Sequence, residues 1–270
     1  MIRRVLNTLR KKPKQFIPLA LKVGQQHMCS LFQNTSFFMQ GQMDINPKSR
    51  WHRDEFRKLT GGYYPTHDDT KRQICNLEPW DNTRRDMLVL LLRTIIEKEI
   101  EGDLAELGVY KGHTAKLIHH YMPERMLHLF DTFEGFTDRS VATEKANTNL
   151  HISQSHFADT SLDSVKSHIA QKNNHVMYYR GYFPESIPAH FDELRFAFVH
   201  LDADLYEPTM EGLKFFYPRV STRGLIVVHD YNTWPGARKA VDEFFSDKDE
   251  MPIPMPDKSG SAVIVKHEKT

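Results

Sequence analysis

Residues 104–121 read LAELGVYKGHTAKLIHHY, and this segment decides the fold class. Its first six residues are mostly apolar without strict alternation, which predicts a strand over 104–109 that is covered on both faces. A helix is predicted over 113–121. Between them, Gly108 allows a tight turn, and Gly112 allows a helix or a ligand to approach the backbone closely. A strand, a tight turn and a helix in this order indicate an α/β protein.

The alternation of strands and helices continues on both sides of this segment. Upstream, residues 85–100 (RDMLVLLLRTIIEKEI) are predicted to be helical. Several downstream strands are apolar throughout, which indicates a parallel sheet with helices on both faces. We therefore predict one α/β domain over 85–270. The other expected strands are 126–131, 176–180, 195–201, 224–229 and 261–266, and the other expected helices are 160–171, 207–217 and 236–245.

Residues 1–84 have a different composition and are predicted to form a basic N-terminal arm and a cap. Seven basic residues precede the first acidic residue, Asp44. In 1–24, apolar residues recur at helical spacing with cations between them. This pattern predicts an arm that contacts a membrane surface or a partner. The alternative is a solvated basic terminus. Turn signals in 25–83 predict an irregular or helical cap.

Composition and charge exclude several classes of protein. A chain of 270 residues with 40% hydrophobic residues is not disordered as its main state. Lys and Arg number 36 against 35 Asp and Glu, so the net charge gives no electrostatic basis for nucleic-acid binding. Cys29 and Cys75 lack metal-binding spacing, and no apolar run is long enough for a membrane helix. We expect a cytoplasmic protein. Any membrane contact is expected only through the basic N-terminus. The oligomeric state is left open, and a homo-oligomer is one possibility.

Ligands of parallel α/β sheets bind beyond the carboxyl ends of the strands, where two predicted strands carry acidic residues. Glu106 begins the pattern E-x-G-x-x-x-G and occupies the first glycine position of a dinucleotide-binding motif. A carboxylate at that position favours a cationic ligand group, although a plain turn with a solvated Glu106 fits the same pattern. Asp131 ends the second strand, where it could accept hydrogen bonds from ribose hydroxyls.

Two later strands also end in acidic residues, within His200-Leu-Asp202-Ala-Asp204 and His229-Asp230. Asp202 and Asp230 would repel each other, and a divalent cation would remove that cost by accepting oxygen ligands from both. Asp204 faces the substrate if the strand turns at Ala203. The alternative is that these acids cap the helices that follow.

Several motifs, in one order over about 85–245, resemble the macrocin O-methyltransferase (TylF-type) family. The resemblance implies a Rossmann-like class I S-adenosylmethionine-dependent methyltransferase fold, with a mostly parallel seven-stranded sheet and helices on both faces. It also implies a divalent metal, usually Mg²⁺, and typically a sugar hydroxyl as acceptor. The motifs are ELGVYKG, DTFEGF, GYFPESIP, HLDADLYEPT, FYPRVSTRGLIVVHDYN and PGARKAVDEFF.

The resemblance also implies roles for individual residues. Asp202 and Asp230 would ligate the metal, and Asp204 would be the general base. The family usually has two adjacent acidic residues at the end of the fifth strand, whereas here the first of them is His229. His229 is either a metal ligand or a hydrogen-bonded residue behind the ligands. An imidazole ligand suits Mn²⁺ better than Mg²⁺. The implied cofactor-binding set, with the methionine end at Glu106, Gly108 and Gly112 and the ribose at Asp131, is Glu106, Gly108, Val109, Gly112, Asp131, Thr132 and Phe133.

The sequence therefore predicts an O-methyltransferase that acts on a sugar hydroxyl of a natural product or a surface glycan. One alternative is a metal-independent methyltransferase in which Asp204 or His229 is the base. Another is a non-catalytic binding or scaffold protein. The long polar loop 137–159 is expected to be a lid, an acceptor contact or a disordered insert.

Overall fold

The computed structural model describes most of the chain from residue 81 onward, namely 81–169, 175–188, 191 and 193–268. The predicted arm (1–24) and nearly all of the predicted cap (25–83) lie outside these residues. The proposed boundary at residue 84 therefore stays a prediction.

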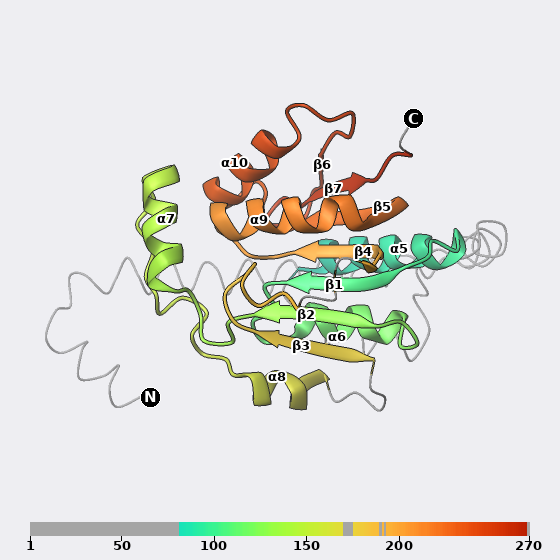
Figure 1. Cartoon of the computed structure of the whole chain (residues 1–270), viewed down its shortest axis with the longest axis horizontal. Helices are drawn as coiled ribbons and strands as arrows, with labels where there is room; N and C mark the ends of the chain where they lie inside the picture. Colours follow the sequence, from blue (N-terminus) through green and yellow to red (C-terminus); the bar gives the residue numbers. More distant parts are fainter. Residues whose placement is uncertain (1–80, 170–174, 189–190, 192, 269–270) are drawn as a thin grey trace, which may run out of the picture. The chain divides into compact units, whose positions relative to one another are not determined.

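A seven-stranded sheet forms the centre of the described region, in the order β3-β2-β1-β4-β5-β7-β6 (Figure 1). The first five strands along the chain are parallel, and β7 runs antiparallel to its neighbours β5 and β6. This confirms the predicted mostly parallel sheet. The strands are β1 (Asp103–Leu107), β2 (Leu127–Asp131), β3 (Val176–Arg180), β4 (Phe196–Leu201), β5 (Val220–Val228), β6 (Ile253–Pro254) and β7 (Ala262–Val265).

Strand order reverses beside β1, which pairs with β2 on one side and with β4 on the other. Loops that follow neighbouring strands at such a reversal turn away from each other and leave a crevice for ligands. Gly108 makes this crossing tight: its φ is +85°, and a Cβ there would lie 2.1 Å from the carbonyl oxygen of Asp202. The loops after β1 and β4 therefore touch through a position that only glycine can occupy.

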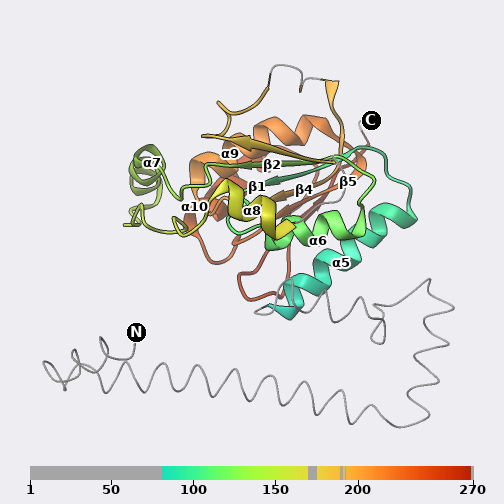
Figure 2. The same cartoon turned by 90° about the horizontal axis from the view of Figure 1, so that it is seen from below.

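Helices cover both faces of the sheet, as predicted, with α9 on one side and α5, α6 and α8 on the other (Figure 2). Strand β5 shows why, because Leu225 and Val227 belong to one buried cluster while Ile226 and Val228 belong to the other. Helix α10 packs against α9. The helices are α5 (Asn82–Glu97), α6 (His113–Tyr121), α7 (Asp138–Thr148), α8 (Leu162–Ile169), α9 (Tyr206–Phe216) and α10 (Pro235–Phe244), with a short 3₁₀ helix at Tyr217–Arg219.

Several elements differ from the sequence prediction, including β6, which was not expected, and β5, which begins at Val220 and not at residue 224. Helix α5 begins three residues earlier than expected, because the side chain of Asp81 accepts the backbone N–H of Arg84 at 3.0 Å and caps the helix. The region 137–159 contains α7, whose first turn is capped by the side chain of Thr137. The only side chains of α7 that are buried are Ser140 and Glu144, so it has no apolar stripe by which a helix could be recognised.

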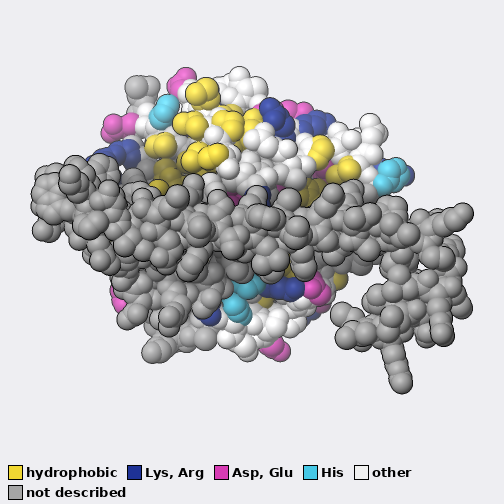
Figure 3. Space-filling view, turned by 180° about the vertical axis from the view of Figure 1, so that it is seen from behind, with side chains coloured by type: hydrophobic (Ala, Val, Ile, Leu, Met, Phe, Trp, Pro, Cys, Tyr) yellow, Lys and Arg dark blue, Asp and Glu magenta, His cyan; other side chains and the backbone are white. Residues whose placement is uncertain are grey.

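The surface of the described region is mixed in charge. On the face seen in Figure 3, Lys and Arg side chains lie among Asp and Glu side chains, with exposed hydrophobic side chains between them. Among the described helices, none is long and apolar enough to cross a membrane.

Candidate active site

A cavity of about 250 Å³ lies at the carboxyl ends of the parallel strands, at the reversal beside β1. Loops after all five parallel strands contribute to its wall. Predicted site residues that line it are Gly108, Asp131, Thr132, Asp202, Asp204, His229 and Asp230.

Asp131 organises the part of the cavity between β1 and β2. Its Oδ2 accepts the backbone N–H groups of Val109 at 2.6 Å and Tyr110 at 2.9 Å, and its Oδ1 accepts that of Phe133 at 2.6 Å. Val109 and Phe133 have buried side chains and take part through their backbones. Asp131 thus fixes the turn after β1 while its half-buried carboxylate also lines the cavity.

Glu106 lies behind the cavity wall and does not line it. Its side chain is buried, and Oε1 lies 3.0 Å from Nδ1 of His200. Burial lowers the pKa of His200 to about 3, so its ring is neutral at physiological pH. Gly112 also lies away from the cavity lining, at the start of α6. These two residues of the predicted cofactor set therefore lie outside the cavity lining.

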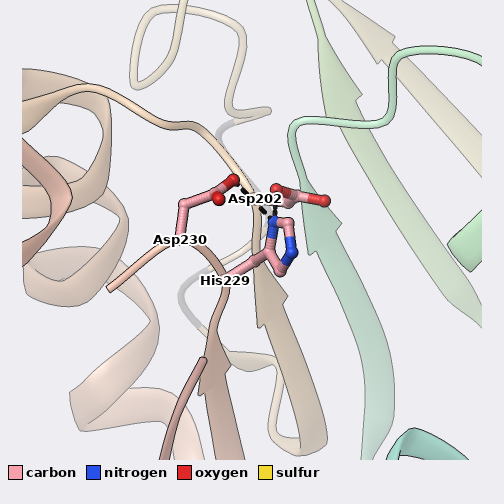
Figure 4. A group of neighbouring side chains, drawn as sticks. All are labelled: Asp202, His229 and Asp230. Atoms are coloured by element: carbon pink, nitrogen blue, oxygen red, sulfur yellow. Dashed lines mark hydrogen bonds and ion pairs between the residues drawn. The ribbon is translucent and has the colours of Figure 1, made fainter. Parts of the chain in front are cut away.

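The three predicted metal ligands lie together (Figure 4). Asp202 follows β4, whereas His229 and Asp230 follow β5. Nδ1 of His229 lies 2.7 Å from Oδ1 of Asp202 and 2.7 Å from Oδ2 of Asp230. One ligand atom from each residue lies within 4.8 Å of the other two. Two carboxylate oxygens and one imidazole nitrogen therefore face a common point.

This cluster holds a proton where a metal ion could bind. Burial alone would lower the pKa of His229, but the carboxylates of Asp202 and Asp230 outweigh burial and raise it to about 10. The pKa of the Asp202 carboxyl, which burial alone would raise, is held well below its usual range by the charges of His229 and Arg84. At neutral pH, an imidazolium thus bridges two carboxylates.

Arg84 is a site residue that the sequence prediction missed. It comes from the first turn of α5, and one terminal nitrogen of its guanidinium donates to Oδ2 of Asp202 at 2.7 Å and to the hydroxyl of Thr114 at 3.2 Å. The same nitrogen lies 3.4 Å from Nε2 of His200. A cation in the first turn opposes the helix dipole, and this unfavourable placement is a signal that could have identified the residue.

Asp204 lies beside this cluster in the cavity wall. Burial raises the pKa of its carboxyl well above the usual range, and the charges of Asp202 and Asp230 together with a hydrogen bond to Asp230 raise it further. Asp204 and Asp230 both have a φ of +58°. This left-handed conformation is strained for residues other than glycine, and it is often found at functional sites. A raised pKa makes the ionised carboxylate of Asp204 a stronger proton acceptor than an ordinary carboxylate.

Comparison with known proteins shows which sequences and structures this chain resembles. Residues 80–266 match the family model for macrocin O-methyltransferase (TylF). Demethyldecarbamoylnovobiocin O-methyltransferase of Streptomyces niveus is 28% identical over 211 residues, which cover 72% of this chain and 73% of the relative. Mycinamicin III 3''-O-methyltransferase of Micromonospora griseorubida is 30% identical over 158 residues, 54% of this chain and 61% of the relative.

Solved structures share the fold at lower sequence identity. The O-methyltransferase NovP superposes with a TM-score of 0.57 at 22% identity, covering 69% of this chain and 80% of that chain. The calicheamicin methyltransferase CalS11 superposes with a TM-score of 0.56 at 19% identity, covering 83% of this chain and 94% of that chain. The sheet and helices described above therefore form a methyltransferase fold.

Proposed function

The chain belongs to the macrocin O-methyltransferase (TylF) family, and we propose that it transfers the methyl group of S-adenosylmethionine to a sugar hydroxyl of a natural product or glycan. Membership of the family makes it an S-adenosylmethionine-dependent O-methyltransferase. The names of its relatives support the finer proposal, since one methylates a rhamnosyl tetracenomycin at the 4' position and another methylates mycinamicin III at the 3'' position.

The cofactor fits the part of the cavity between β1 and β2. Asp131 presents its carboxylate there for the ribose hydroxyls, and Thr132 lies beside it in the wall. Gly108 lies in this wall, and the backbone N–H groups of Val109 and Phe133 hold the carboxylate of Asp131. Glu106 and Gly112 do not line the cavity. Gly108 would serve the methionine end of the cofactor, in the same cavity as the acidic ends of β4 and β5.

The donor set at those strand ends fits a divalent ion. Asp202 and Asp230 offer oxygen, His229 offers nitrogen, and the three ligand atoms already converge. This mixed set suits Mn²⁺ better than Mg²⁺, because Mg²⁺ prefers oxygen ligands only. When bound, the ion would make a neighbouring hydroxyl more acidic and hold it in place.

The residues of the chain supply the proton transfer and the alignment. Asp204 takes the proton of the acceptor hydroxyl, whose oxygen forms the new bond to the methyl carbon as the carbon–sulfur bond breaks and leaves a neutral thioether. Arg84 binds one oxygen of Asp202, so the other oxygen is directed at His229. Alignment of oxygen, methyl carbon and sulfur contributes much of the rate.

One observation carries the proposal, which is that Asp204 lies in the same cavity as Asp131 and the Asp202–His229–Asp230 cluster. The test uses purified full-length protein, S-adenosylmethionine and a panel of acceptors that includes 6-deoxysugar glycosides, the free sugars and simple catechols. We expect methylation of a glycoside hydroxyl, located by mass spectrometry and NMR. Transfer to the catechols alone would show that the proposed acceptor class is wrong.

A further inference from the structure

Glu144 is a buried carboxylate on α7, a helix with few buried side chains. Helix α7 lies on the side of the molecule toward which the arrowheads of β1, β2 and β4 point (Figure 1). Glu144 has no exposed surface, and only one other side chain of α7, Ser140, is buried. Helix α7 is therefore docked through polar groups, and a buried carboxylate of this kind must be satisfied by donors or positive potential.

The carboxylate of Glu144 meets the first turns of α9 and α10. Its Oε2 accepts the backbone N–H of Tyr206, the first residue of α9, at 2.7 Å. A Cβ added to Gly236, in the first turn of α10, would lie 2.3 Å and 2.4 Å from the two carboxylate oxygens. Leu205 and Trp234, the N-cap residues of α9 and α10, make no side-chain capping bond. A single anion thus lies at two helix N-termini, where the helix dipoles favour negative charge.

These helices begin directly after the acidic loops of the site. Asp204 lies two residues before the start of α9, and Asp230 lies five residues before the start of α10. Both acids have left-handed backbone conformations, which persist only where the surroundings hold them. Helix α7 itself follows β2 and the turn of Asp131, so Glu144 links the cofactor side of the cavity to both acidic loops.

We propose that Glu144 is a positioning residue for methyl transfer. Its carboxylate joins α7 to the first turns of α9 and α10 and so fixes Asp204 and Asp230 relative to each other. The expected effect on the rate of methyl transfer rests on the proposed function, whereas the contact of Glu144 with α9 and α10 does not depend on it. Two further contacts follow the same path, since Arg139 of α7 pairs with Glu207 of α9 at 2.6 Å and Asn147 of α7 accepts from Lys239 of α10 at 3.2 Å.

The test compares Glu144→Gln with Glu185→Gln in the full-length protein. Glu144→Gln keeps the shape of the side chain and removes its charge. Glu185 is an exposed carboxylate that pairs with Arg139 of α7, so its substitution by Gln is a matched control. Hydrogen exchange measured by mass spectrometry needs no turnover and reports the linkage directly. We expect faster exchange at the first turns of α9 and α10 in Glu144→Gln and unchanged exchange there in Glu185→Gln.

Kinetics then separates a positioning role from a merely structural one. We expect Glu144→Gln to lower kcat about tenfold to a hundredfold, with the KM for acceptor and the Kd for S-adenosylmethionine changed less than twofold. Unchanged exchange in Glu144→Gln overturns the inference whether or not the protein methylates the panel. An active wild-type enzyme whose kcat survives the substitution also overturns it. A wild-type enzyme that methylates none of the panel, with faster exchange in Glu144→Gln, instead overturns the proposed function and leaves the linkage standing.

A second pair of variants covers the case in which Glu144→Gln does not fold. Tyr206→Pro removes the N–H that Glu144 accepts, at a helix position where proline is tolerated, and Tyr206→Ala removes the side chain but keeps the N–H. The Pro variant should reproduce the faster exchange of the first turn of α10, and the Ala variant should not. Equal behaviour of the two variants would overturn the inference.

Discussion

Asp202 lies between two cations, the guanidinium of Arg84 and the imidazolium of His229, each 2.7 Å from one of its oxygens. With Asp230 as the second anion, two negative charges face two positive charges before any metal ion binds. A divalent ion bound by His229 would have to displace the proton of its imidazole. The two cations explain why the pKa of the Asp202 carboxyl stays well below its usual range in a largely buried setting.

Replacement of Arg84 by Gln should destabilise the protein. It removes the guanidinium that donates to Asp202, and we expect the free energy of unfolding to fall by about 2 to 3 kcal/mol. This is below the full cost for a buried pair, because the Asp202 side chain is 21% exposed. Urea titration measures the loss. Arg93→Gln on the same helix, which breaks an exposed pair with Glu97, should cost about 0.5 kcal/mol or less. Equal losses for the two variants would contradict the role of Arg84.

The raised pKa of His229 predicts that metal binding depends on pH. Below a pKa of about 10 the imidazole carries a proton that must leave before Nδ1 can ligate, so apparent affinity for Mn²⁺ should rise about tenfold per pH unit toward that value. Calorimetry in buffers of different ionisation enthalpy should show about one proton released. His229→Asp should abolish most of this release and shift preference toward Mg²⁺. Affinity that is independent of pH would show that His229 is not a ligand.

At the scale of elements, the sequence predicted what apolar patterns and strand ends encode. The five parallel strands were predicted, several of them from continuous apolar runs, and the acidic cluster was predicted because strand ends converge. Helix α7 was missed because its docked side is polar. Arg84 was missed because it precedes the first strand and reaches the site only through the packing of α5. The burial of Glu106 behind the wall depends on its contact with His200, which no local pattern specifies.

The turn after β1 depends on Asp131, which accepts three backbone N–H groups. Asp131→Ala removes those bonds and the carboxylate that faces the ribose, so we expect S-adenosylmethionine binding to weaken by about 1.5 to 3 kcal/mol. Isothermal calorimetry measures the change. Asp163→Ala, at an exposed acid on α8, serves as the control. Cofactor affinity within twofold of wild type in Asp131→Ala would contradict the proposed cofactor wall.

In the whole molecule, every described residue that lines the cavity lies at position 84 or later, within the segment that matches the family. All seven strands of the sheet also lie within this segment. The chemistry is thus assigned to the predicted domain 85–270 with the addition of Arg84. The arm predicted for 1–24 lies outside the described residues, and its membrane contact stays a prediction.

We propose that the acidic ends of β4 and β5 hold a divalent ion and that Asp204 removes the proton of the acceptor hydroxyl. The most direct measurement is methyl transfer by metal-free protein in chelator, followed by addition of Mn²⁺ or Mg²⁺, for wild type and Asp204→Asn. We expect no transfer in chelator and recovery with metal, best with Mn²⁺. Asp204→Asn should still bind the ion but lose about 10²- to 10⁴-fold in rate. Full activity of metal-free wild type in chelator would contradict the claim and favour a metal-independent enzyme in which Asp204 or His229 alone is the base.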